Sequence, residues 1–543
     1  MAALHLRENH PRLQVTIAVK GLLGQSGCTR MVQGGYNCVL HPRDSLDLHY
    51  GDTIRGGAYL NHQELAWRLV EEAPRRIVEL ENKAGCLFDR NADGTIHQKP
   101  FAGQSFDRTV HKGDLTGIEI MSNLRDYILE QEEIRVLQEC RGLDLLADEG
   151  RVRGALLLQT HTGKLIAVDA RATLVATGGG ARMYKISSPS LEKSGDGMAM
   201  CARAGARFVD MEMLQFHPTG LLVGGSIATG GLLEEGLRGA GARLFNGLGE
   251  RYMERYDPKI ERATRDVVSR SSYLEIMAGR GSANGGVYLD ASHLGAKFML
   301  ENFPGMVERC RDYGFDLVNG RVEVSPSAHY QMGGVQIGLC CETNLEGLFV
   351  AGEDAGGVHG ANRLGGNGVA DSIVFGGVAG DCMPDRLLPK GQFAGSRIGE
   401  LCERWTRPLT KPGRGAAFRL RRSLEALMWQ KAGVVRSGGL LGEAARELAE
   451  TALEAEAAGA GGAAASNPEW GEVLNLINTC AVARMLVESA LYRTESRGAH
   501  FRQDFPNSSA EWLRNIVLEW RGGDMRLTTQ PVVFTRMAPE ERQ

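Results

Sequence analysis

The chain has 543 residues, 43% hydrophobic and 24% charged, proportions typical of a folded globular protein with about two to four domains. Its formal net charge of −4 leaves no excess of basic side chains for a polyanion, which argues against nucleic acid as a partner. Glycine is abundant: 71 of the 543 residues are glycine, well above the usual share of about 7%. Repeated glycine clusters after apolar runs indicate backbone that approaches a large ligand closely, although a tight turn explains any single cluster.

The first 35 residues predict a helix, a strand and a glycine-rich loop. Residues 1–8 are typical of the end of a helix, residues 13–19 form a short β-branched run typical of a buried strand, and residues 24–35 form the loop. This order matches the second half of a dinucleotide-binding βαβ unit. The first strand and glycine turn of such a unit would precede Met1, so we expect the sequence as given to be shortened at its N-terminus.

Two further strand–glycine units follow far along the chain. Residues 172–176 predict a strand that runs into three glycines, with a helix over residues 198–204 behind it. Residues 347–351 predict another strand, followed by a glycine-rich turn and a helix over residues 369–379. Together the three units predict one nucleotide-binding domain interrupted by an insertion.

The predicted fold class is therefore α/β, with four regions. A Rossmann-like domain covers residues 1–209 and 326–390, and an α+β capping domain covers residues 210–325. Helical periodicity predicts a helical domain over residues 391–512, and residues 513–543 form a small C-terminal region with a strand over 531–535. The Ala- and Gly-rich tract 454–465 is a loop or a frayed helix, and its composition weakly favours the loop.

Neither a membrane span nor a metal site is indicated. No run approaches about 18 uninterrupted apolar residues, and the first residues are charged where a signal peptide needs an apolar stretch. We therefore expect a cytoplasmic protein that reaches a membrane only through partners. The 11 cysteines contain no CxxC pair, which favours reduced, mostly buried thiols over zinc or iron–sulfur ligands.

Histidines and arginines near glycine-rich turns indicate an anionic ligand. His217, Arg265, His329 and Arg363 lie in four such polar clusters. Arginine binds a carboxylate through two parallel donors, and histidine adds a donor whose charge is tunable. A single His or Arg in such a place is more often structural, so the prediction of an anionic ligand depends on the four residues together.

Several segments resemble one family in the same order along the chain. MEMLQFHPTG, EEGLRGAGARLFNGLGERYMERY, RATRDVVSRSSYLEI, SAHYQMGGV and GLFVAGEDAGGVHGANRLGG are similar to blocks of the flavoprotein subunits of succinate dehydrogenase and fumarate reductase, which are related to L-aspartate oxidase. The motif RGAH at residues 497–500 resembles the dehydrogenase and reductase branch more than the aspartate oxidases. The resemblance implies an FAD-dependent oxidoreductase that interconverts succinate and fumarate by hydride transfer with flavin N5, in electron transport and the tricarboxylic acid cycle.

The resemblance also implies a partner and residue roles. Electrons are exchanged with an iron–sulfur subunit, with a membrane anchor reached through other subunits. His217, His329 and Arg363 hold the dicarboxylate, and Arg265 transfers a proton, recharged by Glu235 and Arg238; a purely electrostatic Arg265 is the second interpretation. The positions implied around FAD are Lys20, Ser26, Thr29, Gly34, Gly35, Ala176, Gly178, Asp196, Glu353, Gly368 and Val369.

The sequence departs from the family at several of these positions. Cys28 stands where many relatives have the histidine that binds flavin covalently, so we expect non-covalent FAD rather than a thioether to Cys28. Non-covalent flavin should have a lower potential, which favours fumarate reduction over succinate oxidation. Glu234 replaces a Thr or Ser that binds substrate, unless Thr229 takes over that role, and Gln331 and Ala240 replace a usual Thr and Glu. L-aspartate oxidase and a non-catalytic homologue remain the alternative functions.

Overall fold

The nucleotide-binding part is built on two pairs of parallel strands. The computed structural model describes residues 1–521 and 523–539. Strand β1 (Val15–Ala18) pairs with β5 (Ile134–Leu137), and β9 (Thr173–Val175) pairs with β16 (Leu348–Val350), each in parallel. The strands predicted at 13–19, 172–176 and 347–351 are therefore confirmed. Within the described ranges the two pairs form separate sheets. The predicted shortening of the N-terminus stays a prediction.

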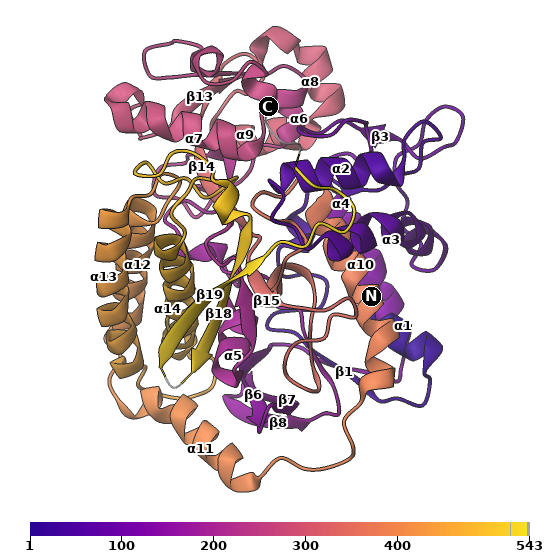
Figure 1. Cartoon of the computed structure of the whole chain (residues 1–543), viewed down its shortest axis with the longest axis vertical. Helices are drawn as coiled ribbons and strands as arrows, with labels where there is room; N and C mark the ends of the chain where they lie inside the picture. Colours follow the sequence, from indigo (N-terminus) through magenta and orange to yellow (C-terminus); the bar gives the residue numbers. More distant parts are fainter. Residues whose placement is uncertain (522, 540–543) are drawn as a thin grey trace.

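Helices and small sheets surround these strands (Figure 1). The helices are α1 (Ala2–Asn9), α2 (Leu46–Gly56), α3 (Gln63–Asn82), α4 (Thr116–Leu129), α5 (Asp196–Ala204) and α10 (Asn367–Cys382). A three-stranded sheet contains β2 (Tyr36–Asn37), β4 (Thr109–Val110) and β3 (Gln98–Lys99), and a second contains β6 (Cys140–Asp148), β7 (Arg151–Gln159) and β8 (Lys164–Asp169). The predicted helices at 1–8, 198–204 and 369–379 are confirmed, the last with an extra turn.

Helix α10 is packed so closely that its glycines have no room for a side chain. A Cβ at Gly377 would lie 2.5 Å from Arg76 Cζ on α3, and one at Gly380 would lie 2.6 Å from the Ala2 carbonyl oxygen on α1. Small residues let helix backbones approach at such distances. This packing holds the helix whose first turn faces the candidate site.

The inserted segment forms an upper lobe with its own apolar core (Figure 1). Its sheet has the order β11 (Leu214–Leu221), β14 (Arg321–Gln331), β13 (Val287–Asp290) and β12 (Arg243–Phe245). Its helices are α6 (Glu235–Gly239), α7 (Arg265–Glu275), α8 (Ala296–Asn302) and α9 (Pro304–Asp312). The chain enters and leaves this lobe through β11 and β14, which pair antiparallel. The α/β fold with an α+β insertion is confirmed.

The C-terminal third is helical and ends in a hairpin. It contains α11 (Gly395–Thr406), α12 (Ala416–Lys431), α13 (Gly438–Ala457), α14 (Pro468–Tyr492), β18 (Arg514–Arg521) and β19 (Asp524–Pro531). Strand β18 joins the hairpin to β10 (Arg207–Val209), β15 (Gly334–Gln336) and β17 (Ala355–Gly356). The predicted tract 454–465 is helical only as far as Ala457. The strand predicted at 531–535 is wrong, because β19 ends at Pro531, which pairs with the first residue of β18.

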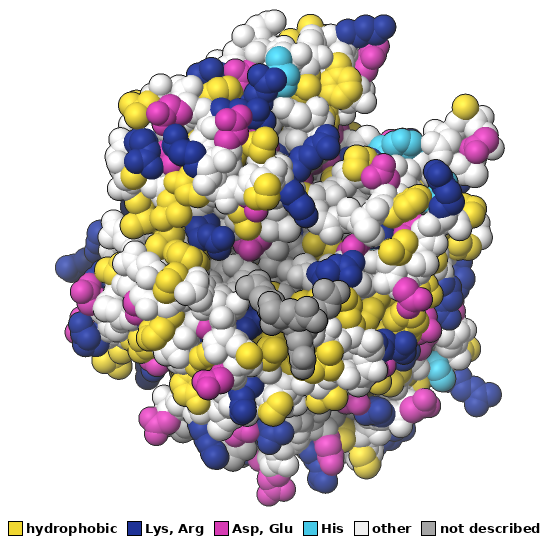
Figure 2. All heavy atoms as spheres, turned by 45° about the horizontal axis from the view of Figure 1, so that its top comes forward, with side chains coloured by type: hydrophobic (Ala, Val, Ile, Leu, Met, Phe, Trp, Pro, Cys, Tyr) yellow, Lys and Arg dark blue, Asp and Glu magenta, His cyan; other side chains and the backbone are white. Residues whose placement is uncertain are grey.

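Helix α14 is a core element. Within the described residues it alone has the length and composition to cross a membrane, and 67% of its most apolar window is buried inside the fold. On the molecular face that Figure 2 shows, basic and acidic side chains are interspersed. That mixture agrees with the small net charge of −4.

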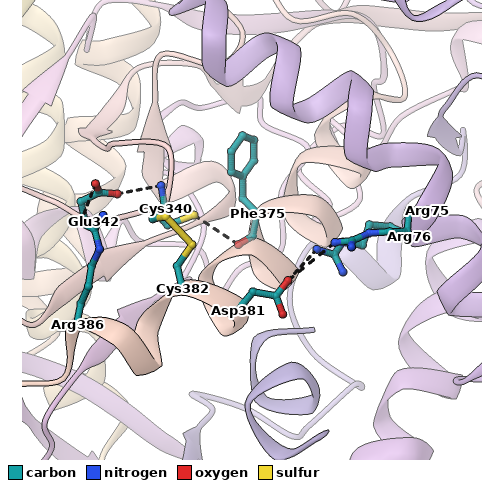
Figure 3. The surroundings of a disulfide bond; sticks show 9 residues. Arg75, Arg76, Cys340, Glu342, Phe375, Asp381, Cys382 and Arg386 are labelled. Atoms are coloured by element: carbon teal, nitrogen blue, oxygen red, sulfur yellow. Dashed lines mark hydrogen bonds and ion pairs between the residues drawn. A yellow bond between two sulfur atoms is a disulfide. The ribbon is translucent and has the colours of Figure 1, made fainter. Parts of the chain in front are cut away.

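One pair of cysteines corrects the expectation of reduced thiols. Cys340, between β15 and β16, forms a disulfide with Cys382 at the end of α10, while the other nine are free (Figure 3). Beside it, Asp381 accepts a hydrogen bond from Arg76 at 3.3 Å (Figure 3). Asp381 also pairs with His5 at 2.7 Å. The pairing could not be deduced from spacing, because it joins residues that are 42 positions apart.

The disulfide predicts a redox-dependent stability. Replacing both partners (Cys340→Ala/Cys382→Ala) should lower the free energy of unfolding by about 4 kcal/mol, because the unfolded chain loses a loop constraint. Urea unfolding with and without dithiothreitol measures it: reductant should lower the midpoint of the native protein and leave the double variant unchanged. Cys402→Ala, at a free cysteine, is the control. Equal midpoints for the oxidised native protein and the double variant would contradict the prediction.

Candidate active site

The amide of Gln215 lies between two buried arginines. Its Oε1 accepts a hydrogen bond from Arg265 Nη1 at 3.1 Å and another from Arg363 Nη2 at 3.3 Å. Its Nε2 donates to the Asn362 side chain and to the Arg363 carbonyl oxygen, both at 2.7 Å. Gln215 comes from β11, Arg265 from the first turn of α7 and Arg363 from the segment before α10. The sequence interpretation did not assign Gln215 to the site, although the residue lies in a segment that carried the resemblance.

Arg363 is held in place by aromatic and backbone groups. Its guanidinium carbon lies 4.3 Å from the centre of the Tyr330 ring, and its Nη1 donates to the Leu364 carbonyl oxygen at 3.2 Å. Burial, with a further contribution from Arg265, lowers the pKa of Arg363 to about 10, so it stays charged at neutral pH. Its Nε has no hydrogen-bond partner among the described residues. A buried cation with an unused donor favours an anionic ligand.

The two predicted histidines meet at the same place. The rings of His217 and His329 are 5.5 Å apart, on the paired strands β11 and β14. Burial, and then Arg265, lowers the pKa of both rings well below the ordinary value, so both are neutral. The Thr219 N–H donates to His217 Nδ1 at 3.3 Å, which places the proton of that ring on Nε2. Each histidine can therefore act as a neutral hydrogen-bond donor or acceptor.

A carboxylate connects Arg265 to a second arginine. Glu235 Oε2 accepts from Arg265 Nε at 2.7 Å, and Glu235 Oε1 lies 3.5 Å from Arg238 Nη2. Burial alone raises the pKa of Glu235, but Arg265 and Arg238 outweigh it and the net pKa is lowered. Glu235 is therefore ionised. The structure brings together all six residues predicted to bind substrate or transfer protons: Arg265, Glu235, Arg238, His217, His329 and Arg363.

A glycine-lined cradle lies beside these residues. Glu353, just after β16, forms an ion pair with Lys193 and accepts from the Gln331 N–H at 2.9 Å. A Cβ at Gly179 would lie 2.6 Å from Glu353 Oε1, and Gly178 has a φ of +85°, so this turn requires glycine. Burial raises the pKa of Asp354 to about 7 while it accepts from the Gly178 N–H at 2.8 Å.

The first turn of α10 completes the cradle. A Cβ at Gly368 would lie 3.0 Å from Arg363 Nη1, so the cradle adjoins the residues predicted to bind substrate. Free backbone N–H groups at the start of a 16-residue helix favour an anionic group such as a phosphate. A carboxylate after a strand, glycine turns and a helix N-terminus fit a dinucleotide. Two further predicted cofactor positions lie beside Gly178 and Gly368: Ala176 directly follows β9, and Val369 lies in the first turn of α10.

The other predicted cofactor residues lie on the loop after β1 or in a buried network. Ser26, Thr29, Gly34 and Gly35 lie between β1 and β2. Lys20 Nζ donates to Asp196 Oδ2 at 2.9 Å and also to Glu192, Ser194 and Asn475, and Asp196 is paired with Arg141 as well. These contacts occupy both side chains, so a direct role for Lys20 and Asp196 at the cofactor stays a prediction.

Four residues at which the sequence departs from the family have distinct surroundings. Cys28 Sγ accepts from the Ser190 N–H at 3.4 Å, and burial raises its thiol pKa. Thr229 donates to the Gly224 carbonyl oxygen at 2.9 Å inside its own turn, so its hydroxyl is not free to replace the missing one at Glu234. Gln331 donates to the Met211 carbonyl oxygen at 2.9 Å, and Ala240 directly follows the last residue of α6.

Phe101 is a site residue that the sequence interpretation missed. A Cβ at Gly365 would lie 2.6 Å from the Phe101 ring, 2.8 Å from Glu235 Oε2 and 3.0 Å from Arg265 Nη2. A Cβ at Gly34 would lie 2.5 Å from the same ring. The glycines at 34 and 365 are the available sequence signal, since they indicate a close approach but not by which side chain.

Comparisons with known proteins match most of the chain. Residues 1–369 match the family model of an FAD binding domain, and residues 421–543 match that of the fumarate reductase flavoprotein C-terminus. The chain is 41% identical over 524 residues to one of the subunits of the fumarate reductase (CoM/CoB) of Methanothermobacter marburgensis, covering 95% of this chain and 94% of that protein. It is 35% identical over 570 residues to the fumarate reductase flavoprotein subunit of Mycobacterium tuberculosis, covering 100% and 96%.

A solved structure agrees with these sequence matches. The quinol fumarate reductase FrdA of E. coli superposes with a TM-score of 0.94 at 30% identity, and the match covers 99% of this chain and 96% of that one. The expectation of FAD as cofactor is confirmed, and the cradle described above fits it.

The cradle predicts that Glu353 contributes to FAD affinity. Glu353→Gln should weaken FAD binding by roughly 10- to 100-fold, because it removes a charged hydrogen-bond acceptor and leaves Lys193 without its counter-charge. Titration of the flavin-free protein with FAD, followed by quenching of flavin fluorescence, measures the dissociation constant. Glu346→Gln, at a carboxylate that is 62% exposed and paired with Arg151, is the control. Unchanged affinity in Glu353→Gln would remove this residue from the cofactor site.

Proposed function

Since the chain belongs to the family of fumarate reductase and succinate dehydrogenase flavoproteins and is an FAD-dependent oxidoreductase, we propose that it interconverts succinate and fumarate. The observation that carries this proposal is the sharing of one Gln215 oxygen by Arg265 and Arg363. Two buried guanidinium groups converge there on a neutral acceptor. A small dianion supplies the charge that this arrangement lacks.

The residues suggest how the two carboxylates are held. Arg363 offers its unused Nε to one carboxylate, and the neutral rings of His217 and His329 offer donors to the substrate without adding charge. Tyr330 stacks against Arg363 and fixes the guanidinium plane. Holding both carboxylates of a four-carbon diacid fixes the central carbons in one orientation.

Arg265 is the proposed proton donor and acceptor. When bound, FAD supplies the hydride chemistry. Arg265 faces the same space, and Glu235 and Arg238 behind it form a buried chain through which its proton can be replaced. Arg238 Nη1 donates to the Glu261 carbonyl oxygen at 2.6 Å, which fixes the far end of that chain. A purely electrostatic Arg265, stabilising charge without transferring a proton, is the alternative that the variants below separate.

The proposed partner is an iron–sulfur subunit. The relatives are named as subunits, and the solved neighbours include the quinol fumarate reductase of E. coli and Sdh1 of Mycobacterium smegmatis in complex with UQ1. We place the chain in the cytoplasm, at the membrane through its partners and their anchor. Cys28 in place of the histidine that many relatives use for the flavin bond supports non-covalent FAD and the direction of fumarate reduction.

The first test is catalytic. In an assay of fumarate-dependent oxidation of reduced viologen, Arg265→Gln should lower kcat by roughly 10²- to 10⁴-fold, because the proton donor is lost. Arg265→Lys distinguishes the two roles. If Arg265 only stabilises charge, the lysine cation should keep much of the rate. If Arg265 transfers a proton, the rate should fall as in Arg265→Gln, because the relay needs the guanidinium geometry. Arg262→Gln, at an exposed arginine three residues earlier, is the matched control.

Three outcomes of that assay would contradict the proposal. Full activity in Arg265→Gln would remove the proton-transfer role. Aspartate-dependent peroxide formation by the native protein would identify an L-aspartate oxidase instead. A flavin-loaded preparation without either activity would identify a non-catalytic homologue.

A second test addresses the flavin linkage. After acid precipitation of the native protein, we expect the yellow flavin in the supernatant, because Cys28 is not alkylated. Cys28→Ser should release the same amount of FAD. A yellow pellet from the native protein that becomes colourless in Cys28→Ser would establish a thioether and overturn non-covalent binding.

A further inference from the structure

We infer that Lys99 and Glu234 form a positioning pair for the Glu235–Arg265 contact, an inference that rests on the proposed function. Lys99 Nζ donates to Glu234 Oε1 at 2.5 Å. The two residues are 135 positions apart and belong to different lobes: Lys99 ends β3 of the nucleotide-binding part, and Glu234 caps the start of α6 in the inserted lobe. The ion pair therefore joins the two lobes directly beside the proposed site.

Both partners are shielded from water on the side of the site. The Glu234 side chain is 4% exposed and that of Lys99 is 17% exposed. The Glu234 backbone N–H donates to Met306 Sδ at 3.1 Å, and Lys99 Nζ donates a second hydrogen bond to the Gly113 carbonyl oxygen at 3.3 Å. A buried ion pair adds little net stability, but removing one partner leaves an uncompensated buried charge.

The pair lies next to the groups that carry the proposed proton transfer. Glu234 precedes Glu235, so its position sets where α6 begins and where the Glu235 carboxylate lies relative to Arg265. On the other side, Lys99 Nζ is 5.8 Å from the centre of the Phe101 ring, which packs beside Glu235 and Arg265 over Gly365. One ion pair therefore adjoins both the helix that carries Glu235 and the Phe101 ring.

The charges around Glu234 explain why a lysine is needed. Burial raises the pKa of the Glu234 carboxyl, Lys99 opposes that rise, and the nearby carboxylates of Asp114 and Glu235 add to it. His111, whose Nδ1 contacts the same Gly113 carbonyl oxygen as Lys99, is neutral because burial and then Lys99 lower its pKa to about 4. Lys99 is thus the cation that balances the charge of Glu234, so that Arg265 and Arg238 can compensate the charge of Glu235.

This arrangement gives the substitution at residue 234 a physical reason. The resemblance implies a neutral Thr or Ser at this position, and a lone carboxylate there would repel both Glu235 and an anionic substrate. Paired with Lys99, Glu234 is electrically neutral as a unit and also closes the two lobes together. The two residues therefore act as a coupled replacement for one hydroxyl.

The test is a double-substitution cycle on the FAD-loaded protein. Lys99→Met should lower kcat for fumarate by roughly 10- to 100-fold with a smaller change in KM, because the Glu235–Arg265 geometry is disturbed. It should also move the acid limb of the pH profile to higher pH, because without Lys99 the neighbouring carboxyls of Glu234 and Glu235 titrate as a coupled pair, and like-charge repulsion raises the pKa of one of them. Lys99→Met/Glu234→Thr should recover most of the rate and the native pH limb, and Lys99→Arg should retain both.

Lys112→Met, at a lysine that is 44% exposed and belongs to a surface pair with Asp89, is the control and should match the native protein. Thermal unfolding of the same set gives a readout that does not need turnover: the double variant should unfold closer to the native protein than Lys99→Met does. Native kinetics and an unmoved pH limb in Lys99→Met, or no recovery in the double variant, would overturn the inference. An inactive native protein would instead refute the proposed function, and the unfolding cycle would still decide whether the pair is coupled.

Discussion

The arrangement of the site depends on two buried guanidinium groups that share one neutral oxygen. Arg265 and Arg363 are both nearly inaccessible to water, at 7% and 6% exposure, and both donate to Gln215. Burying like charges together is costly unless other groups compensate them. Glu235 compensates one, and Tyr330 and the Leu364 carbonyl oxygen hold the other, which leaves the charge that the proposed dianion would balance.

The same electrostatic constraint separates the roles of neighbouring residues. Glu235 is ionised because two arginines outweigh its burial, whereas the adjacent Glu234 needs Lys99 from the other lobe. His217 and His329 are neutral because burial and the arginines lower the pKa of both rings. The charged groups at the site are therefore held in position by residues from both lobes.

In the glycine-lined cradle the limiting factor is the space available for side chains. Gly179 and Gly368 lie where any side chain would meet Glu353 or Arg363, so the backbone forms the wall of the cradle. Helix α10 is held by equally close contacts to α1 and α3, and the disulfide at Cys382 fastens its far end. The closely packed helix brings the cradle and the residues proposed to bind substrate to one place.

Local patterns in the sequence determined the strands at β1, β9 and β16, the helix α10 and the residue types that an anionic substrate requires. These features depend on runs of a few residues, where apolar periodicity and glycine have direct conformational meaning. Only the tertiary structure decided which of these residues meet. Gln215 lies 148 positions from Arg363, Lys99 lies 135 positions from Glu234, and Cys340 pairs across 42 positions. Contacts of such separation follow from how two lobes and a helix pack together, and no local propensity encodes them. For the same reason the strand predicted at 531–535 was wrong: a strand extends only as far as its partner, and β18 begins opposite Pro531.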